Sequence, residues 1–141
     1  MGSAKGPTVT VPHDAWNADR LNSFLSEIDT AISESQYARA VTLSYTCLEG
    51  FLTAFARSKS DDEGLQNELI SLSRWVKEWL KNSINDYPDE VLNLLNHISY
   101  TVDRTRNQFS DAHFAGEAGL WLALYIRDLV NSQIRMLLHF M

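Results

Sequence analysis

Residues 36–57 decide the fold of this chain, and they read QYARAVTLSYTCLEGFLTAFAR. Their apolar side chains fall on more than one side of a helix: Tyr37, Val41, Leu43, Leu48, Phe51, Leu52 and Phe55. A helix that is apolar on several sides is buried between neighbours, so this stretch predicts the central helix of a bundle. Gly50 lies inside it at a cost of about 1 kcal/mol relative to alanine. We expect the close approach of another helix to compensate for that cost.

The segments on either side also have the apolar spacing of helices, with stripes at i, i+3, i+4 and i+7. The expected helices run from Asp14 or Ala18 to Ser33, from Leu65 to Asn82, from Asp89 to about His113, and from Glu117 to Phe140. The connections are a polar loop at Ser58–Gly64, a turn at Asn82–Pro88 and a break at Phe114–Gly116, with Pro88 opening the next helix at its first position. No strand pattern is evident. The predicted fold class is all-α, a compact bundle of about five antiparallel helices.

Length and composition fit a single domain. The chain has 141 residues, of which 45% are hydrophobic, and its formal net charge is −6. We expect residues 1–13 to form a flexible leader and residues 14–141 to form one helical domain. No apolar run is long enough to cross a membrane and no signal peptide is evident, so a cytoplasmic location with no membrane partner is expected. The negative charge argues against nonspecific coating of nucleic acid, although it permits a local basic cleft.

The cysteine and histidine content bounds the chemistry. The single cysteine, Cys47, excludes an internal disulfide and is expected to be a small core residue. His13, His97 and His139 are scattered and form no ligand pattern. No metal and no cofactor are therefore expected. The wide apolar faces of the second and fifth helices are more than one small bundle can bury, which favours a homodimer.

Residues 106–113 carry the candidate chemistry, and they read RNQFSDAH. His113 lies seven positions after Arg106, which on a helix is about 700°, close to two full turns. Both side chains would lie on one face, about 10.5 Å apart along the axis. A fixed cation beside a group that titrates near neutrality suits acid–base chemistry on a phosphodiester.

The run Arg106-Asn107, followed by Ser110-Asp111-Ala112-His113 and Gly116, resembles the hallmark of the HEPN superfamily, small helical domains of RNA-cleaving toxins and antiphage systems. Within it, the chain is most similar to the C-terminal domain of abortive-infection proteins. The segment from Ser44 to Glu49 resembles the serine-to-glutamate segment of that group, and the order of helices agrees over roughly residues 18–141. The chain departs from the group at Phe114, where glycine is usual, and at Tyr45, where a basic residue is frequent.

The resemblance implies a metal-independent endoribonuclease of an abortive-infection or toxin–antitoxin system. The 2′-hydroxyl of RNA would attack the adjacent phosphate, so DNA would be inert. His113 and Arg106 would be catalytic, the first as general acid or base and the second as the group that neutralises charge on the phosphate. Asn107, Asp111 and Glu49 would support them. The expected partners are RNA, a second copy of the chain and a cognate antitoxin protein.

Plainer interpretations of the same residues remain open. Arg106 could pair with Asp103, and His113 could be a helix C-terminal residue favourable to the dipole. Glu49, on an otherwise apolar helix, needs a partner such as Arg106, or else is partly exposed. Two alternative functions follow. One is a non-catalytic HEPN-like module that binds RNA or a partner protein, and the other is a plain helical adaptor or dimerisation domain.

Overall fold

The computed structural model describes residues 18–60, 68–109 and 117–141. These residues form five α-helices and a short closing turn, with no strand among them. The elements are α1 (Ala18–Ser33), α2 (Tyr37–Lys59), α3 (Leu69–Ser83), α4 (Asp89–Phe109), α5 (Leu120–Leu137) and the 3₁₀ turn η1 (Leu138–Phe140). The predicted all-α bundle is confirmed. The expected leader at residues 1–13, the break at 114–116 and the predicted site residues Asp111 and His113 lie outside the described residues.

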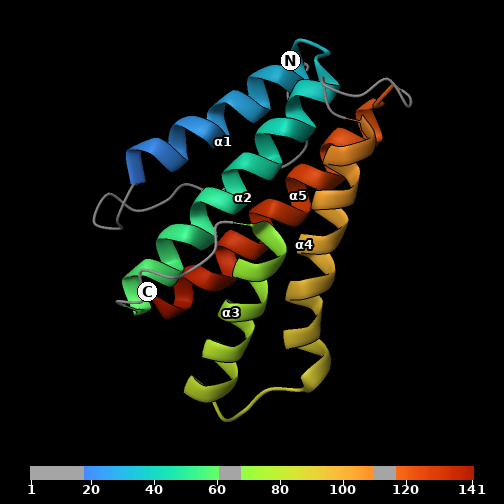
Figure 1. Ribbon diagram of the computed structural model, residues 1–141. Helices are drawn as coiled ribbons and strands as arrows, with labels where there is room; N and C mark the ends of the chain where they lie inside the picture. Colours follow the sequence, from blue (N-terminus) through green and yellow to red (C-terminus); the bar gives the residue numbers. More distant parts are fainter. Residues whose placement is uncertain (1–17, 61–67, 110–116) are drawn as a thin grey trace.

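Helix α2 lies at the centre of the bundle, as its sequence predicts. It contacts α1, α3, α4 and α5. In Figure 1, α1 runs antiparallel to α2, α5 runs along the same diagonal, and the antiparallel pair α3 and α4 extends away from these three helices. Nine residues of α2 are buried, including Phe51 and Phe55. No helix among the described residues is long and apolar enough to cross a membrane.

The turn between α1 and α2 explains how these two helices become antiparallel neighbours. The amide of Gln36 donates to the carbonyl of Ala31 at 2.7 Å, and the amide of Ser35 donates to Ile32 at 3.1 Å. This pair of bonds is the Schellman motif, which closes a helix through one residue of left-handed conformation. Ser35 supplies that residue, with φ of 60°. The chain therefore reverses within three residues.

Several helix ends differ from those predicted. Helix α2 continues through Ser58 to Lys59, so the polar loop starts later than expected. Helix α3 begins at Leu69 after an extended Glu68 with ψ of 137°, and its predicted start at Leu65 lies outside the described residues. Helix α5 begins at Leu120 rather than Glu117, since Gly119 is extended. Pro88 precedes α4 instead of forming its first residue, and its carbonyl accepts the amide of Val91 at 3.1 Å. Apolar spacing marks the buried stripe of a helix, but local backbone geometry sets where each helix ends.

The expectation for Gly50 is wrong. Gly50 is exposed, and a Cβ built on it would have no atom within 4 Å beyond its own helical neighbours. None of the described helices approaches Gly50 closely, so its cost to α2 is not offset by packing against them. Cys47, by contrast, is fully buried as predicted, and this burial raises the pKa of its thiol to about 12.

The apolar faces of α2 and α5, from which a homodimer is predicted, differ in how far the single chain buries them. The apolar residues of α2 are all buried or half-buried within the single chain, so this helix needs no second copy to cover it. The first turns of α5 do expose large apolar side chains, namely Leu120, Trp121 and Tyr125, with Trp121 72% exposed. The reason for expecting a dimer is therefore confined to the start of α5. Trp75 and Trp79 of α3 are partly buried and packed against the core.

Candidate functional site

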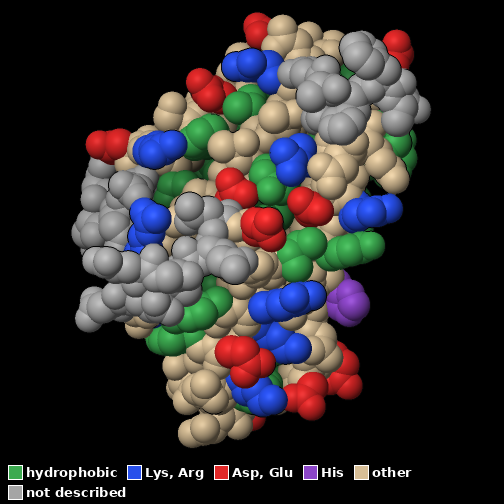
Figure 2. Space-filling view, viewed as in Figure 1, with side chains coloured by type: hydrophobic (Ala, Val, Ile, Leu, Met, Phe, Trp, Pro, Cys, Tyr) green, Lys and Arg blue, Asp and Glu red, His purple; other side chains and the backbone are tan. Residues whose placement is uncertain are grey.

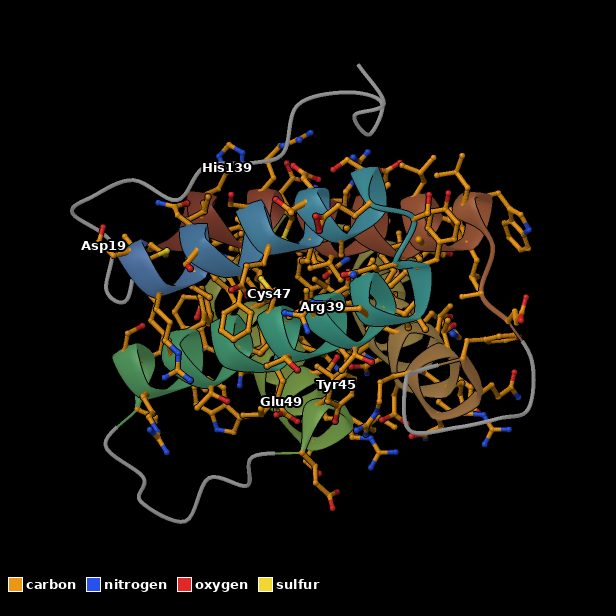
Figure 3. The ribbon with its side chains drawn as sticks, turned by 90° about the horizontal axis from the view of Figure 1, so that it is seen from above. Asp19, Arg39, Tyr45, Cys47, Glu49 and His139 are labelled. Atoms are coloured by element: carbon orange, nitrogen blue, oxygen red, sulfur yellow. The ribbon has the colours of Figure 1, made fainter. Side chains whose placement is uncertain are left out.

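The two sequence segments that carry the candidate chemistry meet where α2 packs on α4. Tyr45 and Glu49 lie one turn apart on α2, and Arg106 lies in the last turn of α4. The guanidinium carbon of Arg106 is 3.9 Å from the centre of the Tyr45 ring. This is the distance of a close cation–π contact. In Figure 3, the labelled side chains of Tyr45 and Glu49 project from the same side of α2.

Glu49 holds the Tyr45 ring in place. The Tyr45 hydroxyl donates a hydrogen bond of 2.9 Å to Oε2 of Glu49. Partial burial of the phenol and this hydrogen bond raise the pKa of Tyr45 to about 12. The phenol therefore keeps its proton at neutral pH, and a neutral ring with a fixed hydroxyl forms the surface on which Arg106 lies.

Arg106 has hydrogen-bonding capacity that its described neighbours do not use. Its side chain is 35% exposed, and its Nη2 atom is 3.8 Å from Oδ1 of Asp103, a long ion pair. Its Nε atom is buried and has no hydrogen-bond partner among the described residues. A guanidinium has five N–H donors in a fixed fork. Arg106 is thus anchored by its flat face, and the exposed part of its guanidinium, not the buried Nε, can still donate to an anion.

Asn107 lies next to Arg106 and is exposed. Its amide nitrogen is 3.5 Å from Oδ2 of Asp103, which is the outer limit of a hydrogen bond. The carboxylate of Asp103 therefore faces both Arg106 and Asn107. The expected alternative in which Arg106 pairs with Asp103 is present in this arrangement, but the long distance leaves the pair weak.

The predicted site residues are brought together in part. Glu49 and Arg106 belong to one cluster, but the hydrogen-bond partner of Glu49 is Tyr45, whose ring contacts Arg106. Of the two alternatives for Glu49, the structure agrees with the second, since its side chain is partly exposed. In the sequence alone, Tyr45 is notable only as a departure from the family pattern. The signal that could have found its role is its spacing, since residues four apart on a helix are neighbours.

Other polar residues of interest lie away from this cluster. Arg104 is exposed, with its guanidinium carbon 5.9 Å from the ring centre of Tyr100. His97 and His139 are exposed, and the described residues hold no group of His, Cys, Asp or Glu that could bind a metal ion. Figure 2 shows acidic and basic side chains interspersed on one face of the molecule, without a continuous basic stripe.

A buried arginine that the sequence did not reveal joins α5 to α1. The Arg127 side chain is 2% exposed, and its Nη2 and Nη1 atoms lie 2.6 Å from Asp128 and 3.5 Å from Asp29. Both carboxylates are more exposed than the arginine. The two carboxylates therefore compensate the positive charge of the buried Arg127, and we assign these ion pairs a structural role.

Comparison of the chain with protein-family models, with curated proteins and with solved structures gave no match. The features of this chain that point to a function are therefore its own: the cluster of Tyr45, Glu49, Asp103 and Arg106, and the sequence that follows Arg106.

Proposed function

We propose that this chain is a HEPN-like domain that cleaves RNA as a metal-independent endoribonuclease, in abortive infection or a toxin–antitoxin pair. The observation that carries the proposal is the state of Arg106. Its guanidinium is held against Tyr45, its side chain is partly exposed, and its only ion pair among the described residues is the long one with Asp103. A preorganised bidentate donor of this kind suits a phosphate whose charge grows during reaction.

The proposed reaction uses the nucleophile of the RNA itself. The 2′-oxygen bonds to the adjacent phosphorus while the bond from phosphorus to the 5′-oxygen breaks. His113 takes the proton of the 2′-hydroxyl or supplies one to the departing 5′-oxygen. Arg106 donates to the phosphate oxygens, and Asn107 adds a donor beside it. The products are a cyclic 2′,3′-phosphate and a 5′-hydroxyl, with no metal ion needed.

A second copy of the chain would complete this site. The exposed apolar residues at the start of α5, Leu120, Trp121 and Tyr125, offer a surface that a homodimer would cover. Pairing two copies so that their Arg106 residues lie near each other would double the local positive charge. This would offset part of the repulsion between RNA and a chain of net charge −6.

A non-catalytic binding module is the second candidate, and one observation favours it. Two carboxylates, those of Glu49 and Asp103, lie within the Arg106 cluster and weaken its attraction for a phosphate. In such a module Arg106 would contact RNA or a partner protein, an antitoxin among the candidates, without cleavage.

Cleavage of a mixed tRNA and mRNA pool in EDTA tests the proposal. We expect wild-type protein to cleave and both Arg106→Ala and His113→Ala to be slower by about 10²–10³-fold, the usual loss when one transition-state donor is removed. Arg104→Ala is the matched control, because it removes an exposed arginine two residues away on the same helix. Circular dichroism would verify that each variant is folded.

The controls separate the candidate functions. Cleavage that survives in Arg106→Ala at the rate of Arg104→Ala would remove Arg106 from the mechanism. Binding of RNA or of a partner that is lost in Arg106→Ala, with no cleavage by any protein, would transfer the assignment to the non-catalytic module.

A further inference from the structure

A groove of about 570 Å³ lies between α1 and α2, outside the Arg106 cluster. Its wall on α2 extends from Thr46 to Ser58, and residues near the start of α1 form the opposite wall. Twelve residues of helix span about 18 Å, so the groove is elongated along α2. Gly50 lies on this wall, and its missing side chain leaves the groove open where a larger residue would narrow it.

Two arginines line the groove, one on each helix. Arg20 of α1 and Arg57 of α2 are both exposed, and within the described part of the chain neither forms an ion pair. The guanidinium carbon of Arg20 is 6.0 Å from the ring centre of Phe24, which also lines the groove and is half-buried. Arginines beside an aromatic ring are what proteins use to hold single-stranded nucleic acid, with phosphates on the cations and bases stacked on the ring.

The hydroxyl groups that line the groove can only accept hydrogen bonds from a ligand. Thr46 and Thr53 donate to the backbone carbonyls of Thr42 and Glu49 at 3.0 and 2.8 Å, and Ser58 donates to Phe55 at 2.7 Å. Each hydroxyl proton is therefore used within α2, and only lone pairs remain for a ligand. A ligand that complements this wall carries hydrogen-bond donors, as the amino groups of nucleic-acid bases do.

Glu49 connects the groove with the Arg106 cluster. It lines the groove and also accepts the hydrogen bond from Tyr45, whose ring contacts Arg106. A strand with one phosphate at Arg106 could therefore continue past Glu49 toward Arg57. The carboxylate of Glu49 repels phosphates, so it favours a register in which a base or ribose hydroxyl, and not a phosphate, lies beside it.

We propose that the groove between α1 and α2 binds the single-stranded RNA next to the phosphate held by Arg106, with one backbone phosphate on Arg20, another on Arg57 and a base on Phe24. This inference rests on the proposed function for its ligand, but it concerns binding and does not require cleavage.

The salt dependence of binding tests the groove directly. The probe is a fluorescent 12-nucleotide 2′-O-methyl RNA, which has the RNA backbone but no nucleophile for cleavage. Each phosphate neutralised on a single strand contributes about 0.7 to the slope of log K against log salt. We expect Arg20→Gln and Arg57→Gln each to reduce the slope by about 0.7. Arg135→Gln, an exposed arginine on α5, is the control for net charge and should leave the slope unchanged.

The outcomes distinguish this proposal from the proposed function. If the slope of log K against log salt falls no more in Arg20→Gln and Arg57→Gln than in Arg135→Gln, the proposed RNA binding in the groove is refuted, whatever the cleavage assay shows. Absence of binding by the wild-type protein at low salt overturns it as well. If the groove variants lose slope as expected while no RNA is cleaved in EDTA, the groove stands and the endoribonuclease proposal fails.

Discussion

Replacing Tyr45 by phenylalanine isolates the hydrogen bond that joins Tyr45 to Glu49. The Phe ring can remain under Arg106. The change therefore removes only the hydroxyl, which donates a hydrogen bond of 2.9 Å to the Glu49 carboxylate. A hydrogen bond to a charged group contributes about 1.5–3 kcal/mol. This pair is only partly buried, and water can replace the lost donor, so we expect the free energy of unfolding to fall by about 1–1.5 kcal/mol.

Urea unfolding followed by circular dichroism measures this loss, and a double-mutant cycle with Glu49→Gln assigns it to the pair. If the hydrogen bond is the source, the double variant should be less destabilised than the sum of the single variants, by about 1 kcal/mol. If Tyr45→Phe has the same free energy of unfolding as the wild type, or if the effects of the two substitutions add fully in the cycle, Glu49 does not hold the ring on which Arg106 lies.

The remaining predictions concern pH, two backbone positions and the buried thiol. The pKa of Tyr45 is near 10 in the unfolded chain and about 12 in the folded protein, so its contribution is complete below pH 10 and is lost as pH rises toward 12; unfolding midpoints of wild type and Tyr45→Phe should therefore converge over that range. Ser35→Gly should raise the free energy of unfolding by about 1 kcal/mol, since glycine adopts φ of 60° without strain, and a lower urea midpoint would contradict the left-handed turn. Gly50→Ala should also stabilise by about 1 kcal/mol, because its Cβ meets no packed neighbour, and destabilisation would show that space there is lacking. Cys47 should react with a thiol reagent only after unfolding, and fast reaction in native buffer would contradict its burial.

Apolar periodicity was sufficient to predict the fold class and the place of α2. Its buried side chains recur on several sides, and only a helix surrounded by others can bury them. The same periodicity could not predict the role of Gly50, because a missing side chain is compatible with a close helix contact and with an open groove. Helix starts at Leu69 and Leu120 depend on the extended conformations of Glu68 and Gly119, which the apolar pattern does not report.

The candidate site shows a similar division. Spacing and family likeness pointed to Arg106 and Glu49 separately, and both belong to one cluster. The residue that joins them, Tyr45, could not be identified from the family pattern because that pattern favours a basic residue there. The groove arginines, Arg20 and Arg57, lie far apart in the sequence and become neighbours of one groove only when α1 folds back on α2.

The most direct test of the central claim is the chemistry of the RNA ends left by purified protein in EDTA, read by mass spectrometry. We expect cyclic 2′,3′-phosphate and 5′-hydroxyl ends with wild-type protein, and neither with Arg106→Ala at matched protein concentration. Ends bearing a 5′-phosphate, or the same cyclic ends at the same yield from Arg106→Ala, would contradict this claim.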